Sequence, residues 1–570
     1  MFVRAKKSGR YEYLQVVQNE RVDGRVRQRV IATLGRVDQL QEEGRVDALL
    51  SSCSRFAQNV AVMDAHKRGA LPPVETIKIG PPLVFERLWR ARKIKEVLGQ
   101  LLRGRKHEFP VERAIFMTVL HRLMVSGSDR AAEVWCRGYQ IDGIDDLELH
   151  HLYRAMAWLG EELPDDQQAG ATPFAPRCIK DLIEERLFAE RRDLFSSLSM
   201  VFFDTTSVYF EGEGGETLGA YGLSKDHRPD RKQMVISVIL DEQGRPICCE
   251  MWPGNTTDVK TLIPIVDRLR GKFNIDRICI VADRGMISKD TVAELRKSVR
   301  SVSYILGVRM RAVKKVREIV LADTKPFKTV YGPRQTSKDP SPLKVKEVVV
   351  GKTRYIVCHN EEQARKDATD RTAIVESLKD KLKGSDKALV GNKGYRKYLR
   401  TSEGKRFEID TEKIESETRY DGKWVLQTDL DVSPKETALR YKDLWMVEAF
   451  FRSLKSIMEN RPIYHKCDET IRGHVFCSFL ALVLFQELQL RLVERGWSVE
   501  WARLKDDLDV LEDVRVECSG QSFIIRSQTR GDTGKALQAA GVALGPTVRV
   551  ASAVRATATV RETPNQHDRA

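Results

Sequence analysis

The pattern that most constrains the fold is a change near residue 199, where short apolar segments begin to alternate with amphipathic ones. Apolar runs of four to eight residues are typical of buried strands, and strands that alternate with helices indicate an α/β domain with a mixed sheet. This pattern continues to about residue 310. The expected strands cover residues 199–203, 234–240, 247–252, 277–282 and 303–308, with helices over 258–269 and 288–299.

The chain has 570 residues, which is too long for a single hydrophobic core. We therefore expect a multidomain α+β protein. The predicted segments are an N-terminal β-hairpin over 1–36, a helical DNA-binding region over 37–165, the first part of the α/β domain over 199–310, a β-rich insertion over 311–432, the completion of the α/β domain over 433–495, and a C-terminal region with a disordered tail over 496–570.

The formal net charge of +15 favours a polyanionic partner, and nucleic acid is the commonest one. The predicted hairpin carries Arg21, Arg25, Arg27 and Arg29, so it is either a DNA-binding ribbon or a solvated strand face. The short helices that follow fit a helix-turn-helix arrangement, although a plain helical bundle explains the same periodicity.

Other features argue against a membrane or secreted protein. No secretory signal is visible at the N-terminus, and the longest apolar run, residues 475–485, is too short to cross a bilayer. This run predicts a buried helix. The ten cysteines form no C-x-x-C pair, so the sequence predicts no structural zinc site. We expect a cytoplasmic protein.

Two aspartates end apolar strands. Asp204 follows residues 199–203, and Asp283 follows residues 278–282. A charged residue at the end of a buried strand points into the crevice where α/β sheets place their chemistry. The alternative is that each aspartate is an ordinary turn residue.

A third acidic residue lies on a long amphipathic helix predicted over 435–458. Tyr441, Glu448 and Lys455 are seven residues apart, and two helical turns take about 7.2 residues, so all three share one face. Arg452 stands one turn beyond Glu448. The alternative is a surface stripe with an i,i+4 pair between Glu448 and Arg452.

These residues carry a resemblance. The order Asp204-Thr205-Thr206, Ala282-Asp283-Arg284-Gly285 and Tyr441-x-x-Leu-Trp-x-x-Glu448-x-x-Phe-Arg-x-Leu-Lys455 resembles the DDE-type insertion-sequence transposases, as do residues 222–233 and 253–258. That family has a ribonuclease H-like fold with a β insertion before the catalytic glutamate. Its signature is Y-x-x-R-x-x-x-E-x-x-x-x-x-x-K, and Leu444 replaces the arginine here.

The resemblance implies a phosphoryl-transfer site in which Asp204, Asp283 and Glu448 hold Mg²⁺ or Mn²⁺, with two ions in all. Asp204 is then the ligand that bridges them. Further residues are expected to contact DNA. The candidates for phosphate contacts are Tyr441, Arg452, Lys455, His227, Arg228 and Lys232; Trp252 is a candidate for base stacking, although core packing is the better explanation for it.

The expected partners are double-stranded DNA, as transposon ends and as target, and a second copy of the chain in the DNA complex. The location implied is the bacterial nucleoid. Two other functions fit the same motifs. One is a related DNA nuclease, and the other is a non-catalytic DNA-binding descendant, against which the presence of all three acids counts.

Overall fold

The computed structural model describes residues 2–22, 25–42, 75–169, 171, 175–191, 199–273, 275, 278–286, 289–295, 302–337, 339–382, 396–401, 407–456, 462–518 and 521–551. The chain divides into two units. One comprises residues 1–77, 512–528 and 545–570, and the other comprises residues 78–511 and 529–544. The tail predicted to be disordered, beyond residue 551, lies outside the described residues.

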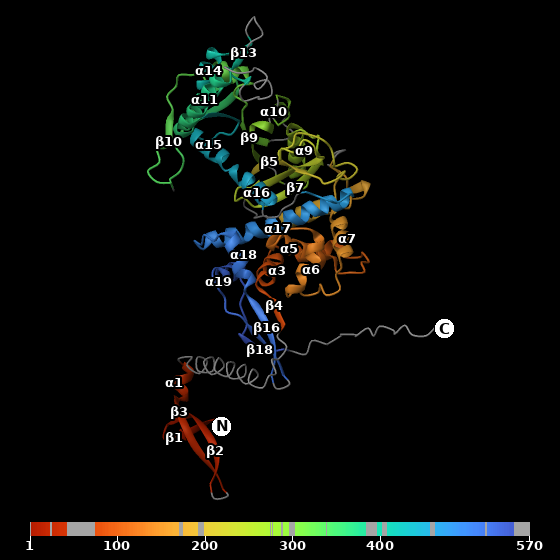
Figure 1. The fold of residues 1–570 in the computed structure, drawn as a ribbon, viewed down its shortest axis with the longest axis vertical. Helices are drawn as coiled ribbons and strands as arrows, with labels where there is room; N and C mark the ends of the chain where they lie inside the picture. Colours follow the sequence, from red (N-terminus) through yellow and green to blue (C-terminus); the bar gives the residue numbers. More distant parts are fainter. Residues whose placement is uncertain are drawn as a thin grey trace, which may run out of the picture. The chain divides into compact units, whose positions relative to one another are not determined.

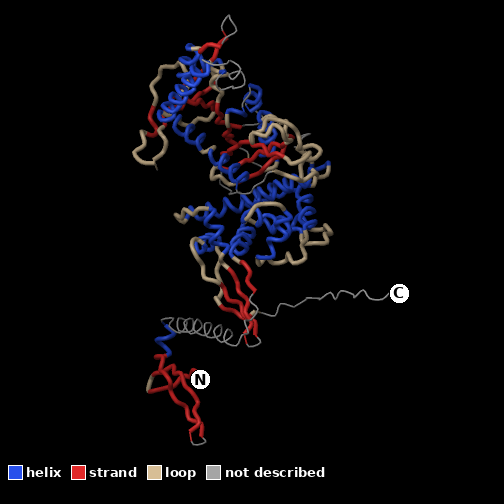
Figure 2. The backbone as a smooth tube through the Cα atoms, in the orientation of Figure 1, coloured by secondary structure: helices blue, strands red, loops and turns tan. Residues whose placement is uncertain are grey.

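The first unit is built mainly from strands (Figure 2). The predicted hairpin is confirmed as β2 (Tyr11–Val22) and β3 (Arg25–Arg36), but β1 (Phe2–Ser8) adds a third strand that the sequence analysis missed. Gly9, with φ of +63°, allows the tight turn between β1 and β2. The short helix α1 (Val37–Glu42) follows. A second sheet has the order β18-β17-β16-β4; its strands are β18 (Val548–Val550), β17 (Gln521–Arg526), β16 (Glu512–Cys518) and β4 (Glu75–Lys78).

The second unit contains a helical layer around one long apolar helix, α17 (Asp468–Glu494), which lies against α5 (Val111–Met124) and α7 (Leu149–Gly160) (Figure 1). This helix is long and apolar enough to cross a membrane, but 72% of its most apolar stretch is buried inside the protein, as a core helix requires. The other helices of the layer are α3 (Gly80–Ala91), α4 (Ile94–Leu102), α6 (Asp129–Trp135), α8 (Ile179–Arg191), α18 (Trp501–Asp509) and α19 (Thr533–Ala540).

The α/β core is the expected mixed sheet. Strands β5 (Ser199–Tyr209), β6 (Gln233–Asp241) and β7 (Pro246–Pro253) form an antiparallel meander, and β8 (Ile278–Ala282) and β9 (Val302–Gly307) continue it in parallel with β5. The spatial order is therefore β7-β6-β5-β8-β9. Helix α9 (Asp258–Gly271) packs its apolar residues against one face of these strands, and α10 (Lys289–Leu295) joins β8 to β9.

The insertion extends this sheet. Strands β10 (Lys328–Tyr331), β11 (Leu343–Val350), β12 (Thr353–His359) and β15 (Lys423–Thr428) continue it from β9, giving nine strands in one sheet. The prediction of strands is confirmed, but the insertion is not only β. It also contains α11 (Glu361–Leu382), α14 (Thr411–Thr418) and the small pair β13 (Leu399–Thr401) and β14 (Phe407–Ile409). The sequence analysis missed these helices because α11 is polar almost throughout and has one buried residue, Leu378.

The single long helix predicted over 435–458 is wrong. Two helices stand in its place, α15 (Pro434–Lys442) and α16 (Trp445–Ser456), with a turn at Asp443 and Leu444. The turn has a packing reason. Helix α15 contacts β8, β9, β11 and β12, whereas α16 contacts β5, β6 and α17. A sheet twists along its length, so one straight helix does not follow both regions.

Candidate active site

The strand register brings Asp204 and Asp283 together. In the parallel pair of β5 and β8, Phe203 lies opposite Ala282, so the next residues of the two strands are neighbours. Asp204 does not end its strand as predicted, because β5 continues to Tyr209 along β6. Instead, Asp204 stands where the pairing with β8 stops. The crevice was expected where both β5 and β8 end. Only β8 ends there, because β5 continues beyond Asp204.

Both aspartates face the same side of the sheet. Successive side chains of a strand point to opposite faces. Val201, Phe203, Ile280 and Ala282 belong to the core cluster that packs on α9, so Asp204 and Asp283 point to the opposite face, toward α15 and α16. Since α16 carries Glu448, the third predicted acid lies on the same side of the sheet as the two aspartates.

Burial leaves Asp204 short of compensating charge. Burial raises the pKa of the Asp204 carboxyl to about 6; Lys225 and the backbone N–H of Thr205 oppose this shift, and the negative charges of Asp283 and Asp258 add to it. The Thr205 N–H donates to Asp204 Oδ1 over 2.7 Å. A buried carboxylate with two acidic neighbours favours a cation, since a positive charge removes both the burial cost and the repulsion.

Asp258 is a fourth acidic residue near the site, and the sequence analysis did not single it out. Its Oδ1 accepts a hydrogen bond from Thr205 Oγ1 over 2.6 Å, and its Oδ2 lies 3.4 Å from Lys225 Nζ. Lys225 also donates to the Thr205 backbone oxygen over 2.7 Å. Asp258 begins α9, on the opposite face of the sheet from Asp204, and it is already paired. It therefore contacts the site from the α9 side of the sheet, through Thr205 and Lys225.

Glu448 is exposed on α16 and lines a cleft of about 640 Å³ together with Asp283 and Tyr441. The three predicted acids share one side of the sheet but do not form a closed cluster. Among the described residues, the group whose ligand atoms all lie within 4.8 Å of one another does not include them. Exposure leaves the Glu448 side chain free to change rotamer.

Tyr441 contacts the site from α15. Its hydroxyl donates to Asp283 Oδ1 over 3.0 Å, and burial, followed by the charge of Asp283, raises the pKa of Tyr441 above its usual range. Gly307, at the end of β9, leaves room for this contact. A Cβ atom at Gly307 would overlap the Tyr441 hydroxyl. Tyr441 therefore orients an acid of the site, a role that the sequence analysis, which assigned it a phosphate contact, did not predict.

The cleft has basic walls. Leu444, which stands in place of the family arginine, is only 6% exposed and so is a packing residue. Arg452 is exposed on α16 but does not line the cleft. Cations come instead from residues that the sequence analysis passed over. Arg309 bonds the backbone oxygen of Arg284 over 3.2 Å. The basic lining residues are Arg284, Arg309, Arg311, Lys423 and Lys442.

The remaining predicted DNA contacts are engaged in ion pairs or exposed. Lys455 Nζ lies 2.7 Å from Asp226 Oδ1, a carboxylate side chain that is 4% exposed. Arg228 pairs with Asp230 over 2.9 Å, and Lys232 pairs with Glu213. His227 is exposed, with φ of +58°. The structure thus places Lys455 against the loop after β5. The sequence analysis had instead expected Lys455 to contact a DNA phosphate.

Trp252 does not serve as a stacking platform. It is 4% exposed, packs in the core against α9, and donates from its indole nitrogen to Ser237 Oγ over 3.1 Å. Its position agrees with core packing, the explanation that the sequence analysis preferred, because the ring ends a strand that α9 covers. Trp445 is the exposed aromatic residue of the cleft, at 60%, three residues before Glu448.

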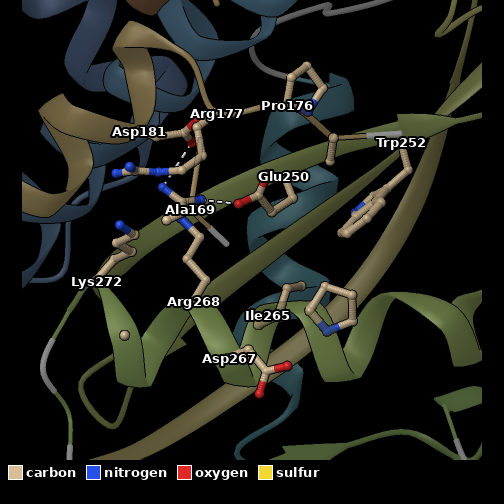
Figure 3. A pocket seen from close by; sticks show the side chains of 13 residues that line it. Ala169, Pro176, Arg177, Asp181, Glu250, Trp252, Ile265, Asp267, Arg268 and Lys272 are labelled. Atoms are coloured by element: carbon tan, nitrogen blue, oxygen red, sulfur yellow. Dashed lines mark hydrogen bonds and ion pairs between the residues drawn. The ribbon is translucent and has the colours of Figure 1, made fainter. Parts of the chain in front are cut away.

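A second cavity, of about 290 Å³, lies beside Trp252 and a buried ion-pair network (Figure 3). Arg268 on α9 pairs with Glu250 on β7 and with Asp181 and Glu184 on α8, the latter two over 2.9 and 2.6 Å. Lys180 completes the network and donates to the backbone oxygen of Cys249. All five side chains are buried. The network joins α8 to the sheet, which is a structural role.

A core of order β7-β6-β5-β8-β9, with a meander, two parallel strands and paired aspartates on one face, is the arrangement of ribonuclease H-like phosphoryl-transfer enzymes. Residues 196–484, just over half of the chain, match the family model described as the transposase DDE domain. Residues 2–65 match the one described as the IS1634 family transposase N-terminal domain. The chain belongs to the DDE-type insertion-sequence transposases, enzymes that cleave DNA and transfer its strands.

One solved structure that matches the chain is the piggyBac transposase synaptic complex with hairpin DNA, determined by cryo-EM. It is 10% identical, with a TM-score of 0.37, and the alignment covers 75% of this chain and 79% of that one. This similarity is too low to relate individual residues. No curated protein matches the chain.

Membership of this family implies the use of a divalent metal. The residues of the cleft fit one on two counts. Carboxylate oxygens are the ligands that hard divalent cations prefer. The raised pKa of Asp204 also records a negative charge that its protein surroundings do not neutralise.

Proposed function

We propose that Asp204, Asp283 and Glu448 are the catalytic acids with which this transposase cuts DNA at insertion-sequence ends and joins it to a target. The register of β5 and β8, which makes Asp204 and Asp283 neighbours facing α16, carries this proposal. Glu448 completes the set by a change of rotamer toward the two aspartates, since its side chain is exposed.

The metal in this proposal is Mg²⁺ or Mn²⁺, with two ions held by the three acids. Bound there, the ions would activate the attacking oxygen and stabilise the leaving one. The chain's own residues prepare the site. Tyr441 holds Asp283 in one orientation, and Lys225 and Thr205 hold Asp258 away from Asp204.

DNA phosphates in this proposal lie along the basic walls of the cleft. Arg284 directly follows Asp283 in the chain, and Arg309 bonds the backbone oxygens of Arg284 and Gly285. They supply the positive charge that an arginine at position 444 provides in the family signature. Trp445 offers an exposed ring beside Glu448, and an aromatic face of this kind stacks on an unpaired base.

The partners in this proposal are double-stranded DNA, as element ends and as target, and a second protomer that pairs the two ends. The net charge of +15 suits binding to DNA. The place of action in this proposal is the nucleoid in the bacterial cytoplasm.

The proposal is tested with linear DNA carrying the element's own terminal repeats. In Mg²⁺ the wild-type protein should nick this DNA and then join the released 3′ ends to a second duplex. Nicking without joining would indicate a nuclease. Binding without nicking, in Mg²⁺ and in Mn²⁺, would indicate a non-catalytic descendant and would contradict the assignment of the acids.

A further inference from the structure

Two histidines and an aspartate meet outside the catalytic cleft. His474 is on α17, His465 is in the segment that leads into α17, and Asp129 is the first residue of α6. Within the described part of the chain, these three form the group whose possible ligand atoms all lie within 4.8 Å of one another. The catalytic proposal uses none of them.

The distances within this group match a small coordination polyhedron. His465 Nε2 lies 3.1 Å from His474 Nδ1 and 3.4 Å from Asp129 Oδ2, and His474 Nδ1 lies 3.9 Å from the same carboxylate oxygen. A tetrahedron with bonds of about 2.1 Å has edges of about 3.4 Å. An octahedral face at the same bond length has edges of about 3.0 Å, which fits less well.

The donor set also suits a metal. Two imidazole nitrogens and one carboxylate oxygen are common ligands of Zn²⁺. Asp129 is 6% exposed and both histidine side chains are 15% exposed, so little water competes for these atoms.

Arg122 on α5 is the competitor. Its Nη2 lies 2.9 Å from His474 Nδ1 and 3.3 Å from Asp129 Oδ1. This guanidinium therefore competes with a metal for the lone pair of His474. It has other acceptors, namely Ser478 Oγ at 2.7 Å and the backbone oxygen of His474. Binding a metal costs Arg122 one bond, and its contact with Asp129 Oδ1 can remain while Oδ2 coordinates, an arrangement usual for ligating carboxylates.

We propose that Asp129, His465 and His474 bind one Zn²⁺ ion, with water as the fourth ligand. The site is distinct from the catalytic acids and takes a different class of metal. Its ligands come from α6, α17 and the segment between α16 and α17. Zinc at this position therefore ties the chain that leaves the Glu448 helix to the helical layer, and so stabilises the packing on which α16 rests.

The experiment uses the full-length protein with any affinity tag removed, since a polyhistidine tag binds zinc. Zinc per chain is measured by plasma mass spectrometry after dialysis against metal-free buffer containing Mg²⁺. We expect about one zinc per chain. Titration of the stripped protein with Co²⁺ should give the intense visible absorption of a four-coordinate ion, which Mg²⁺ does not reverse and Zn²⁺ does. A weak, octahedral-type spectrum would overturn the proposal without any variant.

The variants separate the site from histidines in general. His465→Ala changes a ligand outside the helices, and His150→Ala, at an exposed position of α7, is the matched control. His465→Ala should lose the zinc and the zinc-dependent rise in melting temperature, whereas His150→Ala and Asp204→Asn keep both. Equal zinc in wild type and His465→Ala would refute the site. If His465→Ala folds poorly in EDTA, His474→Gln provides the same comparison with a side chain that can still accept a hydrogen bond.

Discussion

Two groups of acidic residues lie beside the same sheet, and they differ in the cations that neutralise them. Asp181, Glu184 and Glu250 surround Lys180 and Arg268, so three carboxylates share two cations. In the second group, which comprises Asp204, Asp258 and Asp283, Lys225 is the cation that opposes the raised pKa of Asp204, and its ammonium contacts Asp258. The first group borders a cavity of about 290 Å³, which Asp181, Glu250 and Arg268 help to line. In the second group, Asp283 lines the cleft of about 640 Å³.

This difference separates a structural acid from a metal-binding one. In a low-dielectric interior an acid needs a partner, and a group that supplies its own cations leaves no role for an added ion. A group that lacks them carries a standing electrostatic cost, which a divalent cation removes on binding. Each group has three acids, but those of the first group are buried and those of the second are half-buried, so the two groups differ in exposure as well as in their compensating bases.

The largest effect is expected from the catalytic acids. Asp204→Asn, Asp283→Asn and Glu448→Gln should each lower cleavage by at least about a thousandfold, because a lost ligand charge weakens metal binding. Binding to end DNA in a gel-shift assay should persist, since it depends on Lys and Arg contacts. Asp443→Asn, an exposed acid between α15 and α16, is the control and should cut normally. Wild-type cleavage by the three variants would remove the distinction between the two groups.

The next effect concerns the first group, in which Asp181, Glu184 and Glu250 surround Lys180 and Arg268. Arg268→Met should lower the free energy of unfolding by about 3–5 kcal/mol, because three buried carboxylates would be left with Lys180 alone. Lys260→Met removes an exposed cation from the same helix and should change stability little. Urea unfolding followed by circular dichroism measures both. A loss below about 1 kcal/mol for Arg268→Met would show that water reaches the network.

A smaller effect of opposite sign is expected at Asp204. Its folded pKa of about 6 exceeds the usual 3.8, so the folded protein binds the proton more tightly, and stability falls as pH rises from about 4 through 6. Asparagine cannot ionise, so in EDTA at pH 8 Asp204→Asn should be more stable than wild type by about 3 kcal/mol.

This gain should vanish below pH 4 and stay constant above pH 7. Adding Mn²⁺ should stabilise the wild type and not the variant. A variant that is less stable than wild type at pH 8 in EDTA would mean that the Asp204 carboxylate is satisfied without a metal.

The smallest effect is expected at Lys455. Lys455→Met leaves the buried Asp226 carboxylate without its 2.7 Å partner and should cost about 1–3 kcal/mol of stability. The double variant Lys455→Met with Asp226→Asn should recover most of this loss. If Lys455 also contacts DNA, cleavage by the double variant should remain slow. Full recovery of cleavage together with stability would show that Lys455 acts only by holding the loop.

The sequence predicted the elements whose signal is local. Asp204 and Asp283 each follow an apolar run, so their places in the sheet were visible, and α17 was visible from its apolar length. The family resemblance added Glu448. The sequence pattern could not predict the register of β5 against β8. The two strands are about 80 residues apart, and the sequence of neither strand indicates how they pair.

The missed residues share this property. Lys225 and Asp258 lie in segments that the resemblance included, yet their pairing depends on how two loops meet. Asp129 is more than 300 residues from His465, so no ligand spacing exists in the sequence, and the expectation of no zinc site rested on cysteines alone. The turn at Leu444 was missed because the seven-residue spacing continues across it, although the sheet beneath it twists.

Gly307 has a consequence for how copies of such an element lose activity in a genome. Any side chain at this position pushes the Tyr441 hydroxyl away from Asp283. A glycine codon becomes an alanine codon by one base change, so a copy of the element can fall silent while its reading frame and all three acids stay intact. Counting intact acid triads among sister copies would then overestimate how many copies can still transpose. The codon at position 307 would help to distinguish active copies from inactive ones.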